Sequence, residues 1–531
     1  MPAVVWGQSG VACPRFAVGS AIAEPPNIFS QGGVLQLAFS YQTRLDPSGN
    51  ALYCYTTTSG VQSPTLRVHP GDRLKITLQN ALPAPPASAM PGMPGMNAPG
   101  TAAETCGSGV MNDASINIHY HGTNTPPLCH QDEVIRTLVN AGETFDYDLQ
   151  VPPDEPPGLY WYHPHVHGIS EAAVQGGASG ALIVEGIENV NPIVAGLPQR
   201  VLVIRDNPVP ANAAPGGDPP AWDVSLNYVP IPAPGYTPAI IPMHPSEKQF
   251  WRVLNASADT IIDLRLQFDG VAQTLNVVAL DGVPTGSQDA TGPGSTLPMT
   301  DILLAPAARA EFVVTGPSAG VRNAELMTLN INTGPNGDYD PTRPLARIQT
   351  SANAAEPPLT VPAVSGPPPA ERFAGLASAT PTAERRLYFS EVLQDPNNPA
   401  GPTNFYITVD GQKPVLFNPG DPPAIVTTQG AVEDWTIENR AEENHEFHIH
   451  QIHFLLLERN GVPAPPADAQ YFDTIQVPFW PGTGGYPSVK VRMDFRGPTV
   501  GDFVYHCHIL GHEDAGMMAI IRVNPAPAPP Q

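Results

Sequence analysis

The chain has 531 residues, 41% hydrophobic and 14% charged, which indicates a globular protein with sizeable cores. Its 25 basic and 49 acidic residues give a formal net charge of −24, which argues against nucleic acid or an anionic membrane as a partner. A chain of this length predicts three or four domains, and no apolar run is long enough to span a bilayer. The acidic balance predicts either an ordinary solvated surface or an attraction for cationic substrates and metal ions.

A repeated segment gives the first evidence of internal organisation. The 66 prolines and 48 glycines favour short strands joined by turns over helices. A ten-residue segment ending in Asn occurs as GDRLKITLQN at 71–80, SEKQFWRVLN at 246–255 and GAVEDWTIEN at 430–439. Each copy alternates polar and apolar residues towards its end, as a half-buried strand does. Three copies predict three similar β domains.

Composition places the boundaries between these domains. Domain one is expected over residues 1–186, domain two over 198–350 and domain three over 386–525. Residues 351–385 are rich in Ala and Pro and are predicted to form an extended linker. Frequent strand signals with few helical patterns predict an all-β chain built from β-sandwiches.

Four of the five cysteines are candidates for disulfides. Cys13, Cys54, Cys106 and Cys129 allow three pairings, and sequence order favours Cys13–Cys54 with Cys106–Cys129. The alternative is four free thiols in a reducing compartment. The N-terminus has no basic and no apolar region of a signal peptide, so the chain is either cytoplasmic or a mature form. Disulfides favour the mature form of a periplasmic or secreted protein.

Twelve of the 15 histidines fall into four short clusters. Burying so many imidazoles without partners is costly, whereas neutral imidazole is a common metal ligand. Alternate residues on a strand point to the same face, so each His-x-His pair presents two rings side by side. Eight histidines from domains one and three can therefore converge at the interface of these domains. The clusters are His119-x-His121, His163-x-His165-x-His167, His445-x-x-His448-x-His450-x-x-His453 and His506-Cys507-His508-x-x-x-His512.

Cys507 must face away from its two neighbouring histidines, so one strand segment touches two sites. His445 and His512 can complete a site around the Cys507 thiolate, and two His, one Cys and a weak axial Met form a blue-copper electron-transfer site. Met517, ten residues after the cysteine, is the axial candidate, with Met518 as the alternative.

These motifs resemble those of the multicopper oxidases, which include laccases, ascorbate oxidases, ceruloplasmin-type and bacterial copper-resistance oxidases. GLYWYHPHVHG at 158–168 matches GDFVYHCHILG at 501–511, with Pro164 in the place of Cys507. The resemblance covers essentially the whole chain and implies three cupredoxin-like Greek-key domains that bind four copper ions. It assigns type 1 copper to His445, Cys507, His512 and Met517, type 2 copper to His119 and His448, and the type 3 pair to His121, His163, His165, His450, His506 and His508.

The resemblance also implies carboxylates that supply protons near the cluster. Glu513, directly after His512, is one candidate, and Asp132 is the other. The sequence PPLCHQDE before Asp132 departs from the shorter Gly-rich connection usual in the family, and an ordinary surface acid is the alternative for both. His167 and His453 are expected to act in hydrogen bonding or packing beside the ligands. His69, His130 and His244 are expected to be structural or at the surface.

The implied activity is one-electron oxidation of a small reducing substrate coupled to reduction of O2 to water. Phenols and aromatic amines are the expected donors, because 351–385 has neither Met nor His and the segment 88–100, with Met90, Met93 and Met96, is more simply a loop than a Cu(I) relay. One alternative is a metallo-oxidase acting on Cu(I), Fe(II) or Mn(II). The others are a non-enzymatic cupredoxin relative, which would lack ligands, and a copper nitrite reductase, which has two domains and no full trinuclear set.

Overall fold

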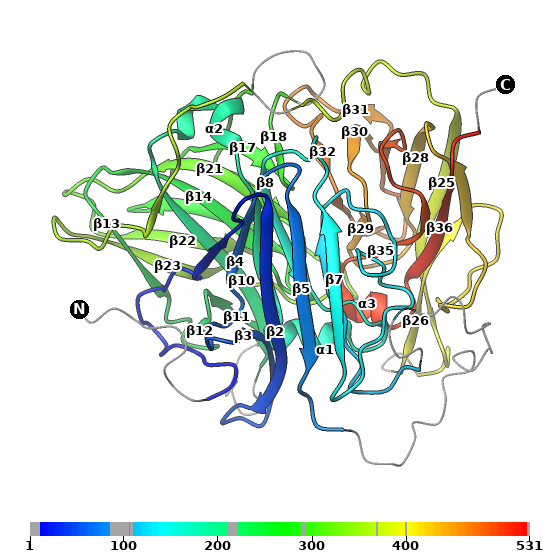
Figure 1. The fold of residues 1–531 in the computed structure, drawn as a ribbon, viewed down its shortest axis with the longest axis horizontal. Coiled ribbons are helices and arrows are strands. Elements are labelled where there is room, and N and C mark those ends of the chain that lie inside the picture. Colours follow the sequence, from blue (N-terminus) through cyan, green and yellow to red (C-terminus); the bar gives the residue numbers. More distant parts are fainter. Residues whose placement is uncertain are drawn as a thin grey trace.

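The computed structural model describes residues 11–84, 106, 110–209, 220–287, 294–367, 370–398 and 401–527. Within these residues the chain is almost entirely β, as predicted, and its strands form three pairs of sheets (Figure 1). The helices in the described part are short, and none of them is long and apolar enough to cross a membrane. They are α1 (Ser170–Gln175), α2 (Ile187–Val190), the 3-10 turn η1 (Pro192–Val194) and α3 (Leu510–Asp514).

The first pair of sheets lies near the centre of Figure 1, in blue and cyan. One sheet carries two of the histidine motifs on neighbouring strands, in the order β1 (Asn27–Phe29), β4 (Thr65–Val68), β9 (Gly180–Val184), β8 (Gly158–His163), β6 (His119–His121). The facing sheet has the order β3 (Ala51–Thr57), β2 (Val34–Leu45), β5 (Arg73–Asn80), β7 (Thr144–Gln150). A shared core that includes Leu35, Ile76 and Tyr162 joins them.

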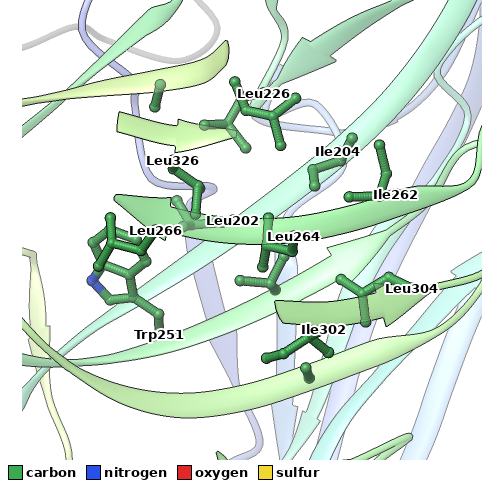
Figure 2. Packing of buried hydrophobic residues seen from close by; sticks show 14 of the residues in the cluster. Leu202, Ile204, Leu226, Trp251, Ile262, Leu264, Leu266, Ile302, Leu304 and Leu326 are labelled. Atoms are coloured by element: carbon green, nitrogen blue, oxygen red, sulfur yellow. The ribbon is translucent and has the colours of Figure 1, made fainter. Parts of the chain in front are cut away.

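The second pair of sheets, green in Figure 1, encloses an apolar core around Trp251, shown in Figure 2. One sheet runs β12 (Val229–Ile231), β11 (Trp222–Leu226), β10 (Pro198–Pro208), β14 (Lys248–Asn255), β21 (Arg309–Thr315), β17 (Leu275–Leu280), β18 (Val283–Pro284), with β19 (Leu297–Met299) beside β17 and β24 (Leu359–Thr360) beside β10. The other runs β13 (Ala239–Met243), β23 (Arg343–Thr350), β22 (Ala324–Leu329), β15 (Ile262–Phe268), β16 (Val271–Ala272), with β20 (Asp301–Leu304) beside β15.

The third pair of sheets, yellow to red in Figure 1, holds the C-terminal histidine motifs. One sheet runs β26 (Thr403–Val409), β25 (Ala383–Leu393), β28 (Val432–Asn439), β34 (Ser488–Asp494), β30 (Phe454–Arg459), β31 (Val462–Pro463), with β32 (Tyr471–Phe472) beside β30. The other runs β27 (Ile425–Thr428), β36 (Met518–Asn524), β35 (Gly501–Cys507), β29 (His445–Ile449), β33 (Thr474–Val477).

The repeated ten-residue segments contain β5, β14 and β28, and each of these strands pairs in parallel with an earlier long strand of its sandwich, β2, β10 and β25 respectively. Their final asparagines are buried, and the side-chain amide of each donates to one main-chain carbonyl in a nearby turn or loop and to one in a strand or bridge: Asn80 to Ala114 and Val139, Asn255 to Thr260 and Leu304, Asn439 to Glu443 and Val477. Half-burial holds for β5 alone. β14 and β28 are covered on both faces, because further apolar clusters pack outside each sandwich.

The described parts of the Ala/Pro-rich segment 351–385 pack against their neighbours. Leu359–Thr360 pairs with the start of β10, and Phe373 and Leu376 are buried with Val432 and Leu455. This segment therefore lies along the second and third sandwiches, where apolar side chains hold it in place.

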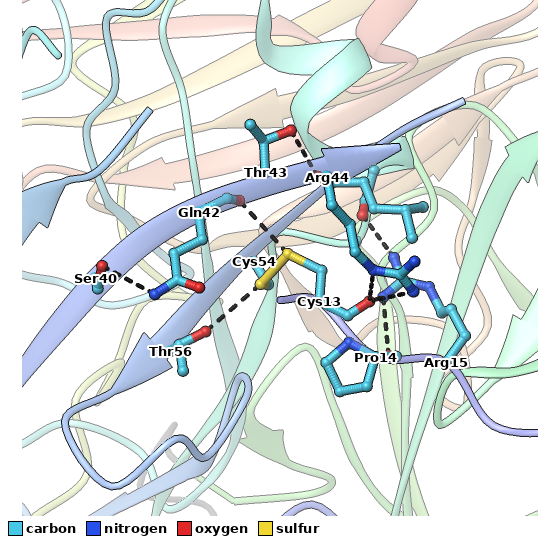
Figure 3. Close-up of a disulfide and its surroundings, with 12 residues drawn as sticks. Cys13, Pro14, Arg15, Ser40, Gln42, Thr43, Arg44, Cys54 and Thr56 are labelled. Atoms are coloured by element: carbon cyan, nitrogen blue, oxygen red, sulfur yellow. Dashed lines mark hydrogen bonds between the residues drawn. A yellow bond between two sulfur atoms is a disulfide. The ribbon is translucent and has the colours of Figure 1, made fainter. Parts of the chain in front are cut away.

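Both predicted disulfides are present, with the pairing that sequence order favours. Cys13 is bonded to Cys54 on β3, and Cys106 to Cys129. The first ties the N-terminal segment to the sheet, and the side chains of Arg15 and Arg44 add hydrogen bonds to the main-chain carbonyl of Cys13 (Figure 3). Cys507 is the free cysteine, and it is buried.

Candidate metal centre

Two pairs of neighbouring strands bring the histidine motifs together. In the first sandwich β6 and β8 are antiparallel, with His119 opposite His163. In the third sandwich β29 and β35 are antiparallel, with His448 opposite His506. Rings from the two sandwiches stack across the interface, with centroids 3.9 Å apart for His119 and His450 and 4.0 Å apart for His121 and His448.

These eight histidines form three groups that could each hold a metal ion. Their nitrogens lie within 4.8 Å of one another in the sets His119/His121/His448, His121/His163/His508 and His165/His450/His506, and every member is buried. In the last set the three Nε2 atoms are 3.1 to 3.2 Å apart. Neutral ring nitrogens cannot all donate protons to one another. Three that lie this close together are therefore suited to binding one shared cation.

The remaining ring nitrogens fit the chemistry of a metal site. The Nδ1 atoms of His119, His163 and His448 donate to Asp132 Oδ1 at 3.0 Å, the carbonyl of Pro164 at 2.9 Å and the carbonyl of Asp473 at 2.8 Å. Their Nε2 atoms are buried and make no hydrogen bond. Metal-bound histidines usually have one nitrogen fixed by an acceptor and the other left for the ion, so the residues fit.

Burial keeps these imidazoles neutral. It lowers the pKa of His163 to about 3 and that of His506 to about 4, and it lowers the pKa of the other six well below the usual value. Neutral rings have lone pairs available for coordination at physiological pH.

A fourth group lies on the other face of β35. His445, Cys507 and His512 are buried together, with Cys507 Sγ 3.6 Å from His445 Nδ1 and 3.7 Å from His512 Nδ1. The two Nδ1 atoms are 3.1 Å apart, and the main-chain N–H of Glu446 points at the sulfur from 3.4 Å. Two imidazoles and a thiol in this arrangement match a blue-copper site, in which the metal would deprotonate the thiol.

The axial candidates differ in their surroundings. Met517 is fully buried in the same apolar cluster as Cys507, and its carbonyl accepts the main-chain N–H of Cys507 at 3.1 Å. Met518 begins β36 and packs with Val134 and Val504 in a separate cluster. The geometry therefore favours Met517.

Comparison with known proteins places this arrangement in a family. Models of the multicopper oxidase family match residues 110–189 and 396–527, which together contain all four histidine clusters. The laccase of Bacillus subtilis is 24% identical over 438 residues, covering 76% of this chain and 78% of its own length. A multicopper oxidase of Staphylococcus haemolyticus is 23% identical over 468 residues, covering 87% and 82%.

The chain belongs to the multicopper oxidase family.

Solved structures agree with this fold. A variant of the McoA multicopper oxidase from Aquifex aeolicus superposes with a TM-score of 0.68 at 20% identity and covers 95% of this chain and 99% of its own. A multicopper oxidase from Campylobacter jejuni, described as a metallo-oxidase, gives 0.67 at 21% identity and covers 99% and 100%. The three sandwiches are thus cupredoxin-like domains. Membership implies a copper-dependent oxidoreductase that uses O2 and a reducing substrate.

Asp132 lies beside the histidine cluster of this multicopper oxidase, despite the unusual connection before it. It is fully buried, its Oδ1 accepts from His119, and its Oδ2 accepts from Gln451 Nε2 at 2.5 Å. Burial raises its pKa to about 7. Asp132 is therefore not a surface acid.

Glu513 is also fully buried, and burial raises its pKa to about 8. His167 Nδ1 lies 3.8 Å from Glu513 Oε1, and the two form a further possible metal group with Asp514. His453 donates to the carbonyl of Asp281, as expected for a residue beside the ligands.

The other predicted residues lie away from the centre. His69 is exposed beside Asp72, His130 donates to the carbonyl of Asp146, and His244 pairs with Glu356. The methionine segment 88–100 lies outside the described residues.

Sequence reasoning missed Asp473, which touches two of the candidate ligands. Its Oδ1 accepts from His121 Nε2 at 3.2 Å and its carbonyl accepts from His448 Nδ1. Burial alone would raise the pKa of Asp473, but the adjacent Arg309 guanidinium holds it below its usual range. No motif surrounds Asp473 in the sequence, so only its neighbours in space identify it.

Sequence reasoning also missed an acidic cleft at His512. The carboxylates of Asp259, Asp338, Asp340 and Glu443 line this cleft together with the imidazole of His512. His512 Nε2 lies 3.4 Å from Glu443 Oε1, and on the companion ligand His445 Nε2 lies 3.0 Å from Glu391 Oε1. The outer nitrogens of both histidines thus face carboxylates.

Proposed function

We propose that this multicopper oxidase takes single electrons from small reducing substrates at the thiolate site and uses them to reduce O2 to water at the histidine cluster. The observation that carries the proposal is the tripeptide His506-Cys507-His508, whose cysteine belongs to one metal group and whose histidines belong to two others. Four copper ions, one at the thiolate and three in the cluster, would supply the redox chemistry.

The chain itself provides a short path between the two sites. Cys507 is joined to both histidines by peptide bonds, and its carbonyl accepts the Nδ1–H of His506 at 2.8 Å. All three side chains are fully buried, so water is excluded along the path. A dry, rigid surrounding fixes the ligands and limits their rearrangement when the charge changes.

Reduction of O2 to two water molecules consumes four protons as well as four electrons. Asp132 would hold a proton at the cluster, where it contacts His119, and Glu513 would hold one beside His167, two residues after the cluster histidine His165. Each lies where a buried carboxyl can exchange a proton close to working pH.

Phenols and aromatic amines are our first choice of donor. The absence of Met and His from 351–385 supports this choice, and so does the likeness to a protein named laccase in Bacillus subtilis.

The acidic cleft at His512 favours a second candidate, oxidation of a metal cation. Carboxylate oxygens suit Fe(II) or Mn(II) better than Cu(I), which prefers sulfur ligands. The solved Campylobacter jejuni relative is described as a metallo-oxidase.

Copper quantification together with a visible spectrum tests the reaction class. We expect four copper ions per chain and an intense thiolate-to-copper absorption band. A purified protein that takes up fewer than two copper ions, or shows no such band when fully loaded, would refute the proposal.

A comparison of donors in a Glu443 variant separates the two substrate classes. Burial, with Glu391 beside it, raises the pKa of Glu443 to about 10, so this carboxyl would bind a cation by releasing its proton. Glu443→Gln should lower kcat/KM for Fe(II) or Mn(II) roughly tenfold or more, because an amide cannot become a carboxylate ligand, and should change that for a neutral phenol less than about twofold. Glu384→Gln, at a carboxylate 74% exposed on β25 of the third sandwich, is the matched control. If wild type and Glu443→Gln oxidise the metal ions equally well, the metal-oxidase candidate is rejected and phenol oxidation is retained.

The two disulfides support a further proposal, that the protein works in an oxidising compartment, either the periplasm or outside the cell.

A further inference from the structure

Domain two contains none of the candidate copper ligands, yet one of its arginines reaches the histidine cluster. Arg309, the first residue of β21, is buried, with 1% of its surface exposed. Its Nη1 and Nη2 donate to the two carboxylate oxygens of Asp473 at 2.7 and 2.5 Å. Its Nε and Nη1 also donate to the carbonyls of Leu159, at 3.1 Å, and Ala307, at 3.2 Å. The planar guanidinium therefore has one well-defined seat.

Asp473 passes this constraint to two metal-binding rings. The Oδ1 atom that Arg309 holds is the same atom that accepts from His121 Nε2. Consequently His121 keeps Nδ1, which is buried and without a hydrogen bond, for an ion. The carbonyl of Asp473 fixes His448 in the opposite sense, with Nε2 left free. Through Asp473, Arg309 thus helps to fix which nitrogen carries the proton in one ring from domain one and one from domain three.

A second residue of domain two closes the network. Asp281 accepts the main-chain N–H of Arg309 at 2.9 Å through Oδ1, and its Oδ2 accepts the main-chain N–H groups of Asp473 and Thr474 at 3.3 Å. Both ends of the Arg309–Asp473 contact are therefore tied to the same carboxylate. Such closure limits the movement of Asp473 relative to the rings.

Gly122, directly after His121, is evidence that the seat is tightly packed. Its φ is +83°, and a Cβ there would lie 2.5 Å from Arg309 Nη2 and 2.6 Å from Asp473 Oδ2. The turn that carries His121 can approach the ion pair only because this residue has no side chain.

We infer that Arg309 is a positioning residue of the histidine cluster, supplied by the domain that holds no ligand. It orients Asp473, and Asp473 sets which nitrogens His121 and His448 present to metal. This inference rests on the proposed copper sites. A purely structural role, in which Arg309 only joins the domains, is the alternative.

Copper binding by full-length variants distinguishes the two roles. Arg309→Gln removes the bidentate contact, and we expect roughly ten- to a hundredfold weaker binding of the cluster coppers, measured as copper per chain during dialysis against graded chelator. The thiolate absorption band should persist, because Arg309 does not contact that site. Arg309→Lys should restore part of the affinity if the charge near Asp473 matters.

A neighbouring buried arginine provides the control. Arg252, on β14, forms a buried ion pair with Glu311, which in turn accepts the N–H of Leu159, but neither side chain contacts Asp473. Arg252→Gln should lower the unfolding temperature and leave the copper affinity of the folded protein unchanged. If Arg309→Gln is merely less stable, or if both variants lose copper equally, the positioning role is wrong. If Arg309→Gln does not fold, Arg309→Lys with unchanged affinity would equally overturn it. A wild-type chain that binds no copper would instead refute the proposed function.

Discussion

The first and third domains carry the same strand motif, but they differ in the side chains on the face of the strand opposite the histidines. Both place a His-x-His segment opposite a second one, on β6 and β8 in domain one and on β29 and β35 in domain three. Between the histidines stands Pro164 in one domain and Cys507 in the other. By position along the motif, Ile116 and Ile169 of domain one correspond to His445 and His512 of domain three.

Domain one has a small cavity where domain three has its thiolate site. Pro164, Ile116 and Ile169 all line this cavity of about 70 Å³. The residues that face the histidine cluster and the residues that face the core can therefore change independently, because alternate side chains of a strand point to opposite sides.

Removal of the Cys507 thiolate is expected to have the largest effect on the difference between the two domains. Cys507→Ser makes domain three resemble domain one, and we expect loss of the intense visible band and of substrate oxidation to background. Three copper ions per chain should remain, because His506 and His508 face the other way. Absorption spectroscopy and copper analysis test this, and a Cys507→Ser protein that stayed blue would contradict the assignment.

In domain one, Asp132 contacts the cluster histidine His119 and can be tested for a role in proton supply. Asp132→Asn should slow turnover by roughly 10- to 100-fold, because the amide cannot act as a proton store and holds His119 less firmly. Saturating-donor turnover with O2 as acceptor is the measurement, and the thiolate band should be unchanged. An unaltered turnover number would show that proton supply at His119 is not limiting.

Glu155 makes the turn after His121 in domain one sensitive to pH. It is fully buried, it accepts from the backbone and side-chain amide of Asn124, and burial raises its pKa to about 7. The folded state therefore binds a proton that the unfolded state has released, and stability falls as pH rises from about 4.5 to about 7, by about 3 kcal/mol. The turn after His450 in domain three has the uncharged Gln451, whose side chain donates to Asp132 of domain one.

Glu155→Gln should remove this contribution to the pH dependence of the free energy of unfolding, measured by denaturant titration between pH 4 and 8. The variant should match wild type at pH 4 and exceed it at pH 8. An identical pH slope in the two proteins would show that Glu155 is not the group responsible.

Pro164→Cys is expected to have the smallest effect. A cysteine alone cannot form a blue site in domain one, because Ile116 and Ile169 offer no ligand atoms. The thiolate band should keep its wild-type intensity and the copper content should stay at four. A second thiolate-to-copper band would show that the isoleucines do not decide the difference between the domains.

Much of this centre follows from local sequence. The two-residue period of a strand places His506 and His508 on one face and Cys507 on the other, whatever the rest of the chain does. The repeated segments identified three β domains, and their final asparagines proved to anchor turns in all three. The disulfide pairing followed from sequence order. The half-burial expected for 246–255 and 430–439 was wrong, because the apolar segments that cover the second face of these strands come from other parts of the chain.

Tertiary structure alone decided what surrounds the ligands. Arg309, Asp281 and Asp473 are separated by up to 192 residues along the chain, yet they form one network. The carboxylates of the cleft at His512 come from two domains in the same way. Isolated charged residues carry no periodic signal, and their roles arise from burial and from partners brought together by folding. The sequence by itself determined which residues can bind metal, and the folded chain decided how their nitrogens are oriented and which charges a donor meets, because only folding sets distances between residues that are remote in sequence.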